Sequence, residues 1–360
     1  MDKLSEAREI ISQVDKDIAL LFEKRMKAVE AVAEHKIENG LSVFDPARED
    51  YLLKRNCAFV EDETIREYYV NFQKSAMEIS KRYQRRILEG MKVAYSGVEG
   101  AYAYIAAKHI FPDGNKISYK DFKAAYEAVE NGECDCAVIP IENSNAGEVG
   151  QVIDLIFNGS LNINNIYTLS IHHNLVALPG AKLENIKKVI SHQQAIDQCS
   201  EFLRSYDLKS EGCSNTARAA QQVSQSDDYT VAAIASKETA ELYGLEILKE
   251  NINESDVNTT RFAVFSRVMN KSENDHSIIV FTVPDKAGAL AHAINVIGHH
   301  GFNMRCIKSR AMKDLMWTYY FYVELGGNLQ SRSGKYMLDE LSDCCDRLKF
   351  IGTFNAENKI

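Results

Sequence analysis

The first 89 residues contain a single glycine, Gly40, and a single proline, Pro46. Apolar residues recur there at spacings of three and four, which predicts one helix from about Leu4 to about Lys36. A helix of that length is about 50 Å long and cannot bury its apolar stripe within so small a module, so we expect this module to dimerise. The residues of the stripe are Ala7, Ile11, Val14, Ile18, Leu21, Ala28 and Val32. A second helix is expected to start near Pro46, because proline favours the first helical turn, and a third to run from about Glu63 to about Leu88.

Cationic residues interrupt this apolar stripe. Arg25 falls on it, Arg8 and Lys36 flank it, and Arg48 and Glu49 open the next expected helix. One interpretation is that long cationic side chains extend out of a helical interface into water. An unpaired buried charge is costly, however, so the cluster favours a small anionic ligand. The forked donors of arginine suit a planar carboxylate.

The run from Arg8 to Gln84 resembles the all-helical chorismate mutases, especially those fused to a prephenate dehydratase. The matching positions are Arg8, Arg25, Lys36, Asp45, Arg48, Glu49, Ser80 and Gln84. The resemblance implies that the three arginines bind the carboxylates of chorismate and that Arg8 reaches the site of the partner subunit. It implies that Lys36 and Gln84 face the ether oxygen, that Glu49 binds the hydroxyl, and that the other two residues orient their neighbours. The rearrangement to prephenate needs no nucleophile, metal or cofactor.

The periodicity of the sequence changes at Lys92. Short apolar runs then alternate with helical patterns, which predicts an α/β module with largely parallel strands over residues 91–268. Residues 269–276 form a polar linker. The pattern of residues 277–360 is βαββαβ, the order of a ferredoxin-like α+β fold. With an all-α module at residues 1–90, the chain is expected to be multidomain.

Polar residues cluster in the α/β module at positions where strands are expected to end. Glu142, Asn143 and Ser144 follow a buried apolar run, and such strand ends are where ligands bind in open α/β sheets. Two further clusters contain Ser191 with Gln198, and Thr259 with Thr260 and Arg261. For each cluster alone, turns and helix caps are the favoured interpretation. The glycine loop SGVEGAY at residues 96–102 lacks a Walker lysine and is a weak phosphate-loop signal.

Together these clusters resemble the prephenate dehydratase domain over residues 92–267, with Thr260–Phe262 as the signature run. The family fold is similar to two-lobed periplasmic binding proteins, with the site between the lobes. The resemblance implies that Thr260 protonates the leaving hydroxyl of prephenate and that Arg261 anchors a carboxylate. It places Glu142, Asn143, Ser144, Ser191 and Gln198 at the substrate. Ala103 departs from the small hydroxyl residue of the family.

Residues 277–360 resemble an ACT regulatory domain of the phenylalanine-sensing kind. Gly288, Ala289 and Leu290 match its glycine turn, and Ser309 with Arg310 match the middle of its second motif. Lys308 and Ala311 depart from the glutamate and proline of that motif, and an aromatic strand follows at residues 317–325. The resemblance implies phenylalanine as an effector bound at a subunit interface.

Composition excludes several classes of protein. The net charge of -9 makes nucleic acid an unfavourable partner, and no apolar run is long enough to span a membrane. The polar start and eight cysteines without C-x-x-C spacing favour a cytoplasmic protein with reduced thiols. The pairs His172–His173 and His299–His300 have no metal-ligand spacing and are interpreted as structural or solvated.

The leading hypothesis is a bifunctional chorismate mutase/prephenate dehydratase, a homodimer or dimer of dimers inhibited by phenylalanine. One alternative is a small-molecule sensor with an ACT domain and no dehydratase turnover, which Ala103 favours. A second alternative is that the helical module is only a dimer scaffold.

Overall fold

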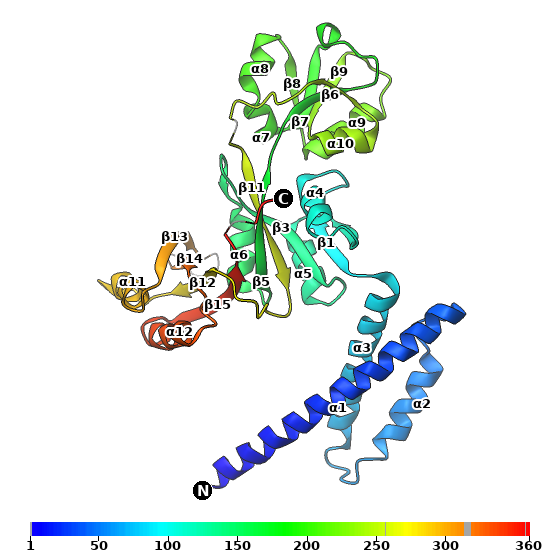
Figure 1. Ribbon diagram of the computed structural model, residues 1–360, viewed down its shortest axis with the longest axis vertical. Coiled ribbons are helices and arrows are strands. Elements are labelled where there is room, and N and C mark those ends of the chain that lie inside the picture. Colours follow the sequence, from blue (N-terminus) through cyan, green and yellow to red (C-terminus); the bar gives the residue numbers. More distant parts are fainter. Residues whose placement is uncertain (1, 256, 313–317, 357) are drawn as a thin grey trace. The chain divides into compact units, whose positions relative to one another are not determined.

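The computed structural model describes residues 2–255, 257–312, 318–356 and 358–360 (Figure 1). The chain divides into two compact units, residues 1–91 and residues 92–360. The aromatic strand expected at residues 317–325 starts with Trp317, and this one residue of it lies outside the described residues. No helix among the described residues is long and apolar enough to cross a membrane.

The smaller unit consists of α1 (Lys3–Asn39), α2 (Pro46–Cys57) and α3 (Arg66–Glu89), as the helical pattern predicts. Asp2 caps the start of α1 by accepting from the amide of Leu4, and Gly40 ends that helix in the left-handed conformation (φ 61°). Pro46 occupies the first turn of α2, as expected. The third helix begins three residues later than predicted, because Asp62 accepts from the amide of Thr64 and forms a turn there.

The apolar stripe of α1 remains largely at the surface of the single chain. Among the described residues of this helix, only Val29 and Ala33 are buried. Ile11, Val14 and Ile18 are 59%, 48% and 43% exposed. The C-terminal half of α1 therefore packs in the unit, and the N-terminal half presents an unpartnered apolar face.

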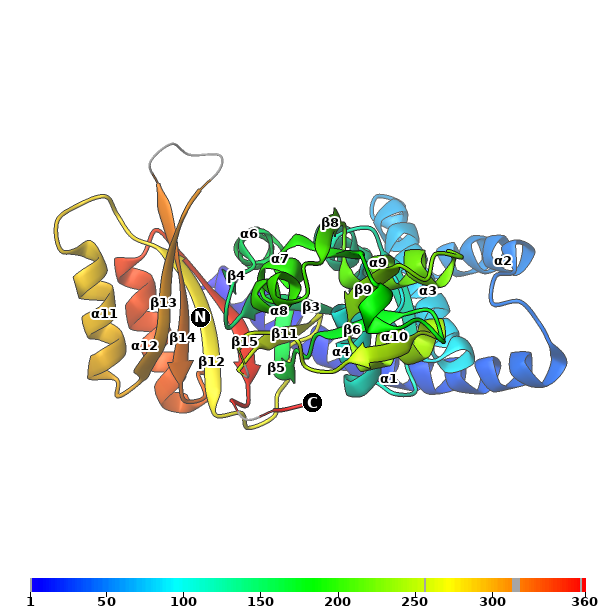
Figure 2. The same ribbon diagram turned by 90° about the horizontal axis from the view of Figure 1, so that it is seen from above.

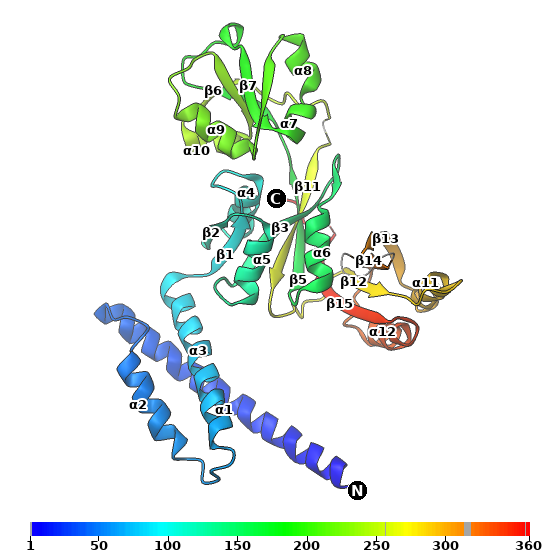
Figure 3. The same cartoon turned by 180° about the vertical axis from the view of Figure 1, so that it is seen from behind.

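The larger unit contains two lobes joined by two chain segments (Figure 3). The sheet of the first lobe follows the order β2-β1-β3-β11-β5. Its strands are β1 (Lys92–Ser96), β2 (Asn115–Tyr119), β3 (Cys136–Asn143), β5 (Asn162–Ser170) and β11 (Thr259–Ser266), with the two-residue β4 (Gly147–Glu148) beside β3. Its helices are α4 (Tyr102–Ile110), α5 (Phe122–Glu130) and α6 (Gly150–Asn158).

The second lobe has a five-stranded sheet in the order β10-β6-β9-β7-β8. Its strands are β6 (Asn174–Ala177), β7 (Lys188–His192), β8 (Lys209–Cys213), β9 (Val231–Ala235) and β10 (Glu246–Lys249). Its helices are α7 (Gln193–Asp197), α8 (Ser200–Ser205), α9 (Thr216–Ser224) and α10 (Lys237–Tyr243), with a short 3-10 turn at Leu183–Asn185. The single helix expected at residues 195–206 is thus two short helices.

The expectation of largely parallel strands is wrong in part. β1 is parallel to β2 and β3, and β7 is parallel to β8 and β9. However, β11 is antiparallel to both β3 and β5, and β6 is antiparallel to both β9 and β10. The cause is that the chain passes from the first lobe to the second and back again. β5 leads out of the first lobe and β11 returns at the same end, so the two strands run in opposite directions.

The C-terminal module, residues 276–360, has the predicted βαββαβ order. Its elements are β12 (His276–Thr282), α11 (Ala289–His299), β13 (Asn303–Ala311), β14 (Tyr319–Gly326), α12 (Arg332–Cys344) and β15 (Arg347–Phe354). The four strands are antiparallel in the order β13-β14-β12-β15. Both helices cover one face of this sheet, where Ile279 and Phe281 are buried (Figure 2). Ile278 and Val280 point to the other face and belong to the core of the first lobe.

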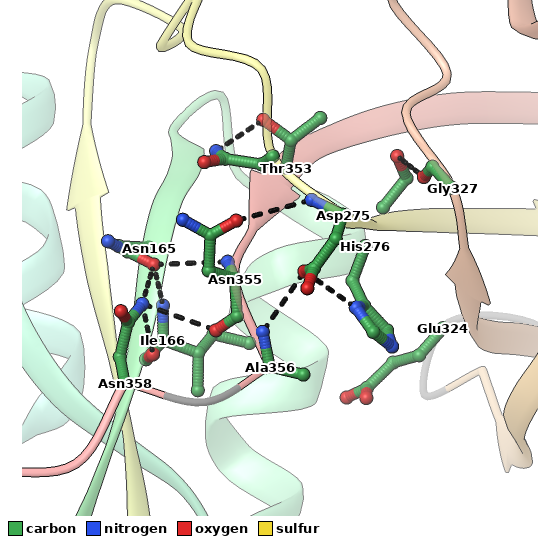
Figure 4. Close-up of polar contacts among 12 residues, drawn as sticks. Asn165, Ile166, Asp275, His276, Glu324, Gly327, Thr353, Asn355, Ala356 and Asn358 are labelled. Atoms are coloured by element: carbon green, nitrogen blue, oxygen red, sulfur yellow. Dashed lines mark hydrogen bonds and ion pairs between the residues drawn. The ribbon is translucent and has the colours of Figure 1, made fainter.

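The C-terminal module and the first lobe share one continuous sheet through β15 and β5. Gly352 pairs with Ile163 there, and a Cβ at Gly352 would lie 1.9 Å from the Ile163 carbonyl oxygen, so only glycine fits. The residues after β15 reinforce this junction (Figure 4). Asp275 accepts from the amide of Ala356 at 3.1 Å, and Asn358 donates to Asn165 Oδ1 at 2.5 Å. The module is therefore held to the first lobe on one sheet face and along one strand.

Candidate active sites in the helical unit and the two-lobed cleft

Arg25 and Ser80 meet between α1 and α3. The Arg25 guanidinium donates to Ser80 Oγ, and Ser80 donates onward to the carbonyl of Ala76 at 2.8 Å. Burial lowers the pKa of Arg25, although a guanidinium stays protonated in proteins. No carboxylate among the described residues forms an ion pair with Arg25. This arrangement leaves a partly buried cation without an anionic partner.

The buried face of α3 consists of Met77, Ser80, Lys81 and Gln84. The amide oxygen of Gln84 is buried and has no hydrogen-bond partner among the described residues. Lys81 lies 3.0 Å from Glu49 Oε1 and 2.5 Å from Glu78 Oε1. Sequence analysis missed Lys81, although its position four residues after Met77 and three before Gln84 places it on the buried face.

The other predicted residues of the helical unit lie around this face. Lys36 donates to the carbonyl of Val43 at 2.8 Å, and Asp45 caps α2 by accepting from the amide of Arg48 at 3.0 Å. The Arg48 side chain is exposed and lies 5.5 Å from the ring centre of Tyr51. Arg8 is exposed near the start of α1. The structure thus joins Arg25 with Ser80 and orders the start of α2, while Arg8 stays on the surface of the single chain.

A cavity of about 550 Å³ lies in the larger unit, lined by residues of both lobes. Asn143, Thr260 and Phe262 come from the first lobe, and Gln194, Gln198 and Thr216 come from the second. His173, on the segment that joins β5 to β6, lines it as well. Three residues predicted from the sequence, Asn143, Gln198 and Thr260, therefore meet in one cleft.

A chain of hydrogen bonds sets the orientation of the Asn143, Asn258 and Gln198 side-chain amides. The backbone amides of Asn145 and Ala146 donate to Asn143 Oδ1, at 3.0 and 2.9 Å, so the Asn143 nitrogen faces the opposite way. That nitrogen donates to Asn258 Oδ1 at 2.9 Å, and Asn258 Nδ2 donates to Gln198 Oε1 at 3.0 Å. Since backbone amides can only donate, the direction of the whole chain follows from them.

Thr260 receives a hydrogen bond from this chain. Asn143 Nδ2 donates to Thr260 Oγ1 at 3.0 Å. Because the hydroxyl oxygen of Thr260 is an acceptor for this bond, its own proton can point to a ligand in the cleft. A donor aimed at Oγ1 also stabilises negative charge that develops there when the proton leaves. Asn143 thus supplies a donor to the Thr260 hydroxyl, a contact that the sequence alone did not reveal.

His173 belongs to the same chain, whereas His172 is exposed, as the interpretation of this pair as structural or solvated predicts. His173 is 3% exposed, and its Nε2 lies 2.9 Å from Gln198 Oε1. Since Gln198 presents an oxygen, Nε2 carries the proton and Nδ1 is an acceptor, 3.3 Å from the hydroxyl of Tyr102. Burial lowers the pKa of His173 and outweighs the opposing effect of Gln198, so the neutral imidazole is favoured. Nothing in the sequence around His173 marks it as a cleft residue.

Four residues predicted at the substrate do not line the cleft. Ser191 is fully buried and donates to the carbonyl of Ile234 at 2.8 Å. Ser144 accepts from the amide of Thr259 at 3.0 Å and closes the end of the β3–β11 pair. Arg261 and Glu142 point to the opposite side of the sheet, where they form an ion pair at 3.0 Å. The expected substrate contacts of these four residues are therefore corrected to structural contacts. For Arg261 and Glu142 the reason is that they neighbour the cleft residues Thr260 and Asn143, and adjacent strand residues face opposite ways.

The start of α4 supplies anion-binding capacity that sequence analysis missed. Ala101 precedes this helix and provides no side-chain cap, and Ala101, Tyr102 and Ala103 all line the cleft. The first amides of a helix are hydrogen-bond donors with a favourable dipole for anions. Ala103, where the sequence departs from the family pattern, therefore lies in the cleft. Lys120 adds a cation at the lining.

The residues predicted as an effector site lie in the C-terminal module. Gly288 adopts the left-handed conformation (φ 80°) before α11, which Ala289 and Leu290 begin. Ser309 is exposed on β13, whereas Arg310 contacts Glu148 Oε1 at 2.5 Å and Asp154 Oδ1 at 3.1 Å. Ser309 and Arg310 therefore face opposite sides of β13, and Arg310 pairs with carboxylates of the first lobe. Lys308 donates to Glu142 Oε1 at 2.5 Å.

Comparison with known proteins gives matches over both units. The Prephenate dehydratase family matches residues 93–270, and the Chorismate mutase type II family matches residues 7–85. The bifunctional chorismate mutase/prephenate dehydratase of Neisseria gonorrhoeae is 30% identical over 355 residues, covering 96% of this chain and 95% of that protein. The protein of the same description from Escherichia coli is 32% identical over 373 residues, covering 98% and 96%.

A solved structure of prephenate dehydratase in complex with L-Phe, from Arthrobacter aurescens, has a TM-score of 0.68 and 27% identity. The match covers 74% of this chain and 90% of that one. The cleft residues and these full-length similarities agree, and the chain belongs to the family of bifunctional chorismate mutase/prephenate dehydratases.

Proposed function

We propose that the helical unit converts chorismate to prephenate and that the two-lobed cleft converts prephenate to phenylpyruvate, with phenylalanine as inhibitor. The mutase is assigned to residues 1–90, the dehydratase to residues 91–268 and an ACT regulatory domain to residues 277–360, with residues 269–276 as linker. The observation that carries the dehydratase assignment is the hydrogen bond from Asn143 to Thr260 in a cleft between two lobes.

In the dehydratase step, prephenate loses its ring carboxylate as carbon dioxide and its ring hydroxyl as water. The electrons of the broken carbon–carbon bond enter the ring, which becomes aromatic as the carbon–oxygen bond breaks. Thr260 Oγ1 gives its proton to the leaving hydroxyl, and the amide nitrogen of Asn143 stabilises the charge left on Oγ1. Water then restores the proton. The uncapped start of α4 and Lys120 hold the carboxylates of prephenate. Arg261 does not take this role, because its side chain points away from the cleft and pairs with Glu324.

In the mutase step, the protein folds chorismate into its reactive conformer and stabilises the ether oxygen as its bond breaks. Arg25 binds a substrate carboxylate, which supplies the anion that this partly buried cation lacks. Gln84, whose buried amide oxygen has no partner among the described residues, donates from its amide nitrogen to the ether oxygen together with Lys36. Glu49 binds the substrate hydroxyl and is already oriented by Lys81. Arg48 is a further carboxylate ligand, and Asp45 and Ser80 orient their neighbours.

A homodimer through α1 follows from the exposed apolar face of that helix. Ile11, Val14 and Ile18 are 59%, 48% and 43% exposed, and a second copy would cover them. Arg8 lies on the same exposed half of the helix, where it reaches the site of the partner subunit. The Arthrobacter aurescens structure in complex with L-Phe supports phenylalanine as the effector. We place its site at the C-terminal module, near Gly288 and Ser309, because these residues carry the resemblance to a phenylalanine-sensing domain.

Chorismate turnover with product identification tests this assignment. We expect prephenate and then phenylpyruvate, with less phenylpyruvate when phenylalanine is added. Arg25→Ala should abolish chorismate consumption and leave turnover of supplied prephenate unchanged. Survival of chorismate consumption in that variant would instead support a scaffold role for the helical unit. Supplied prephenate that yields no phenylpyruvate would favour the sensor alternative, to which Ala103 in the cleft lining lends support.

A further inference from the structure

Residues on the far side of the catalytic strands face the C-terminal module. Thr260 and Phe262 line the cleft, so Arg261 between them points to the opposite face of β11. The pairing register with β3 places Thr260 opposite Asn143 and Arg261 opposite Glu142. The Thr260–Asn143 pair carries the proposed chemistry on the cleft face of the sheet. The charged Arg261–Glu142 pair is adjacent to it in both strands and lies on the opposite face.

A four-residue ion network joins this reverse side to the C-terminal sheet. The two terminal nitrogens of Arg261 each lie 3.0 Å from one carboxylate oxygen of Glu324 on β14. Arg261 Nη1 is also 3.0 Å from Glu142 Oε2, and Lys308 on β13 donates to Glu142 Oε1 at 2.5 Å. Two cations thus meet two carboxylates, and the forked contact between Arg261 and Glu324 fixes orientation as well as distance.

The environment of Glu324 holds its carboxylate in one position. Glu324 is 5% exposed, and Tyr322 donates to its Oε1 at 2.7 Å. The Arg261 guanidinium lies 5.6 Å from the ring centre of Phe354, at the end of β15. Glu324 pairs across β14 with Ile278 of β12, whose side chain belongs to the core of the first lobe. A buried ion pair adds little net stability, so the consequence of this geometry is orientation.

We propose that Glu324 is a positioning residue for the dehydratase reaction. Its forked contact with Arg261 holds β11 against β3 so that Asn143 Nδ2 stays aimed at Thr260 Oγ1. The C-terminal module thereby contributes a side chain to the chemistry of a cleft that it does not line. Any ligand that shifts β14 acts on Thr260 through the same contact. The inference rests on the proposed dehydratase activity of the cleft.

The test compares Glu324→Gln, which removes the charge at constant size, with Glu324→Asp, which keeps it. Glu340→Gln is the matched control, because Glu340 pairs with His300 at 2.8 Å on the exposed side of the same module. Steady-state kinetics are measured on supplied prephenate and, separately, on chorismate, with a thermal melt of each full-length variant. We expect Glu324→Gln to lower the dehydratase kcat about tenfold with KM nearly unchanged. Glu324→Asp should recover part of that loss, and Glu340→Gln and all mutase rates should match the wild type.

Three results would overturn the proposal. An unchanged kcat in Glu324→Gln would show that the network does not position Thr260. A raised KM with unchanged kcat would show that Arg261 binds substrate after all. A loss of kcat in Glu324→Asp and Glu340→Gln as large as that in Glu324→Gln would show a purely structural effect. If Glu324→Gln fails to fold, Lys308→Met is the second variant, and it should lower kcat about threefold at constant KM. A wild-type protein that does not turn over prephenate would refute the proposed function instead.

Discussion

Replacing Asn258 with leucine, which has a similar size and no polar atoms, separates the cleft network from simple packing. Asn258 is 3% exposed, and its side chain makes two bonds, at 2.9 Å from Asn143 and 3.0 Å to Gln198. Neither neighbour is left unsatisfied, since Asn143 still donates to Thr260 and Gln198 still faces His173. The loss is therefore two net hydrogen bonds at about 1 kcal/mol each, or about 2 kcal/mol.

That magnitude predicts the kinetic effect. If both bonds act in the transition state, about 2 kcal/mol corresponds to about a 30-fold lower kcat/KM for prephenate. The assay is the absorbance of phenylpyruvate, with a denaturant melt on the same preparation. The matched control is Asn253→Leu, because Asn253 lies in the same connecting segment and also makes two bonds, with the amide of His173 and the carbonyl of Ser255. It should lose at least as much stability, because the buried amide of His173 loses its acceptor, and less than threefold of its activity. Equal activity losses in the two variants, or an active Asn258→Leu protein, would refute the relay from Gln198 to Thr260.

Three further predictions concern both sites. Thr260→Val should lower the dehydratase kcat at least about 100-fold while Thr260→Ser retains most of it, because only serine keeps the proton donor; prephenate kinetics of the pair check this. Gln84→Leu should raise the free energy of unfolding by about 1 kcal/mol and abolish mutase activity, because the change removes a buried unpartnered oxygen, and a melt with a chorismate assay measures both. The folded pKa of His173 lies below its ordinary value of 6.5, so the folded state binds fewer protons and stability falls as pH drops through 6.5 toward that lower pKa. Melting temperatures between pH 8 and pH 5 should fall more steeply in the wild type than in His173→Gln, and parallel curves would contradict the assignment.

Local pattern was sufficient for much of this fold. The spacing of apolar residues in α1 and the position of Pro46 predicted the helices of the smaller unit, because the helical spacing of apolar residues is visible within a short window of sequence. The βαββαβ order of the C-terminal module was likewise readable from its strand and helix patterns. The direction of β11 was not, because antiparallel pairing with β3 and β5 depends on a chain that leaves for the second lobe and returns about 90 residues later.

The candidate sites divide in the same way. Residue chemistry and family resemblance predicted Asn143, Gln198 and Thr260, which the fold gathers in one cleft. They also predicted Arg261 as a substrate anchor, and there the sequence was insufficient. A strand pattern shows that residues 260 and 261 face opposite ways, but only the tertiary structure decides which face borders the cleft.

The sequence by itself therefore determined which residue types are present, where helices and strands form, and that Arg25 would be a cation in an apolar stripe. Only the tertiary structure joined His173 and Asn258 through Gln198 in one hydrogen-bond chain, and turned Arg261 toward Glu324 and the C-terminal module. The reason is physical. Periodicity and side-chain chemistry are local properties of the chain, whereas a hydrogen-bond network between two lobes depends on which distant segments cross at their junction.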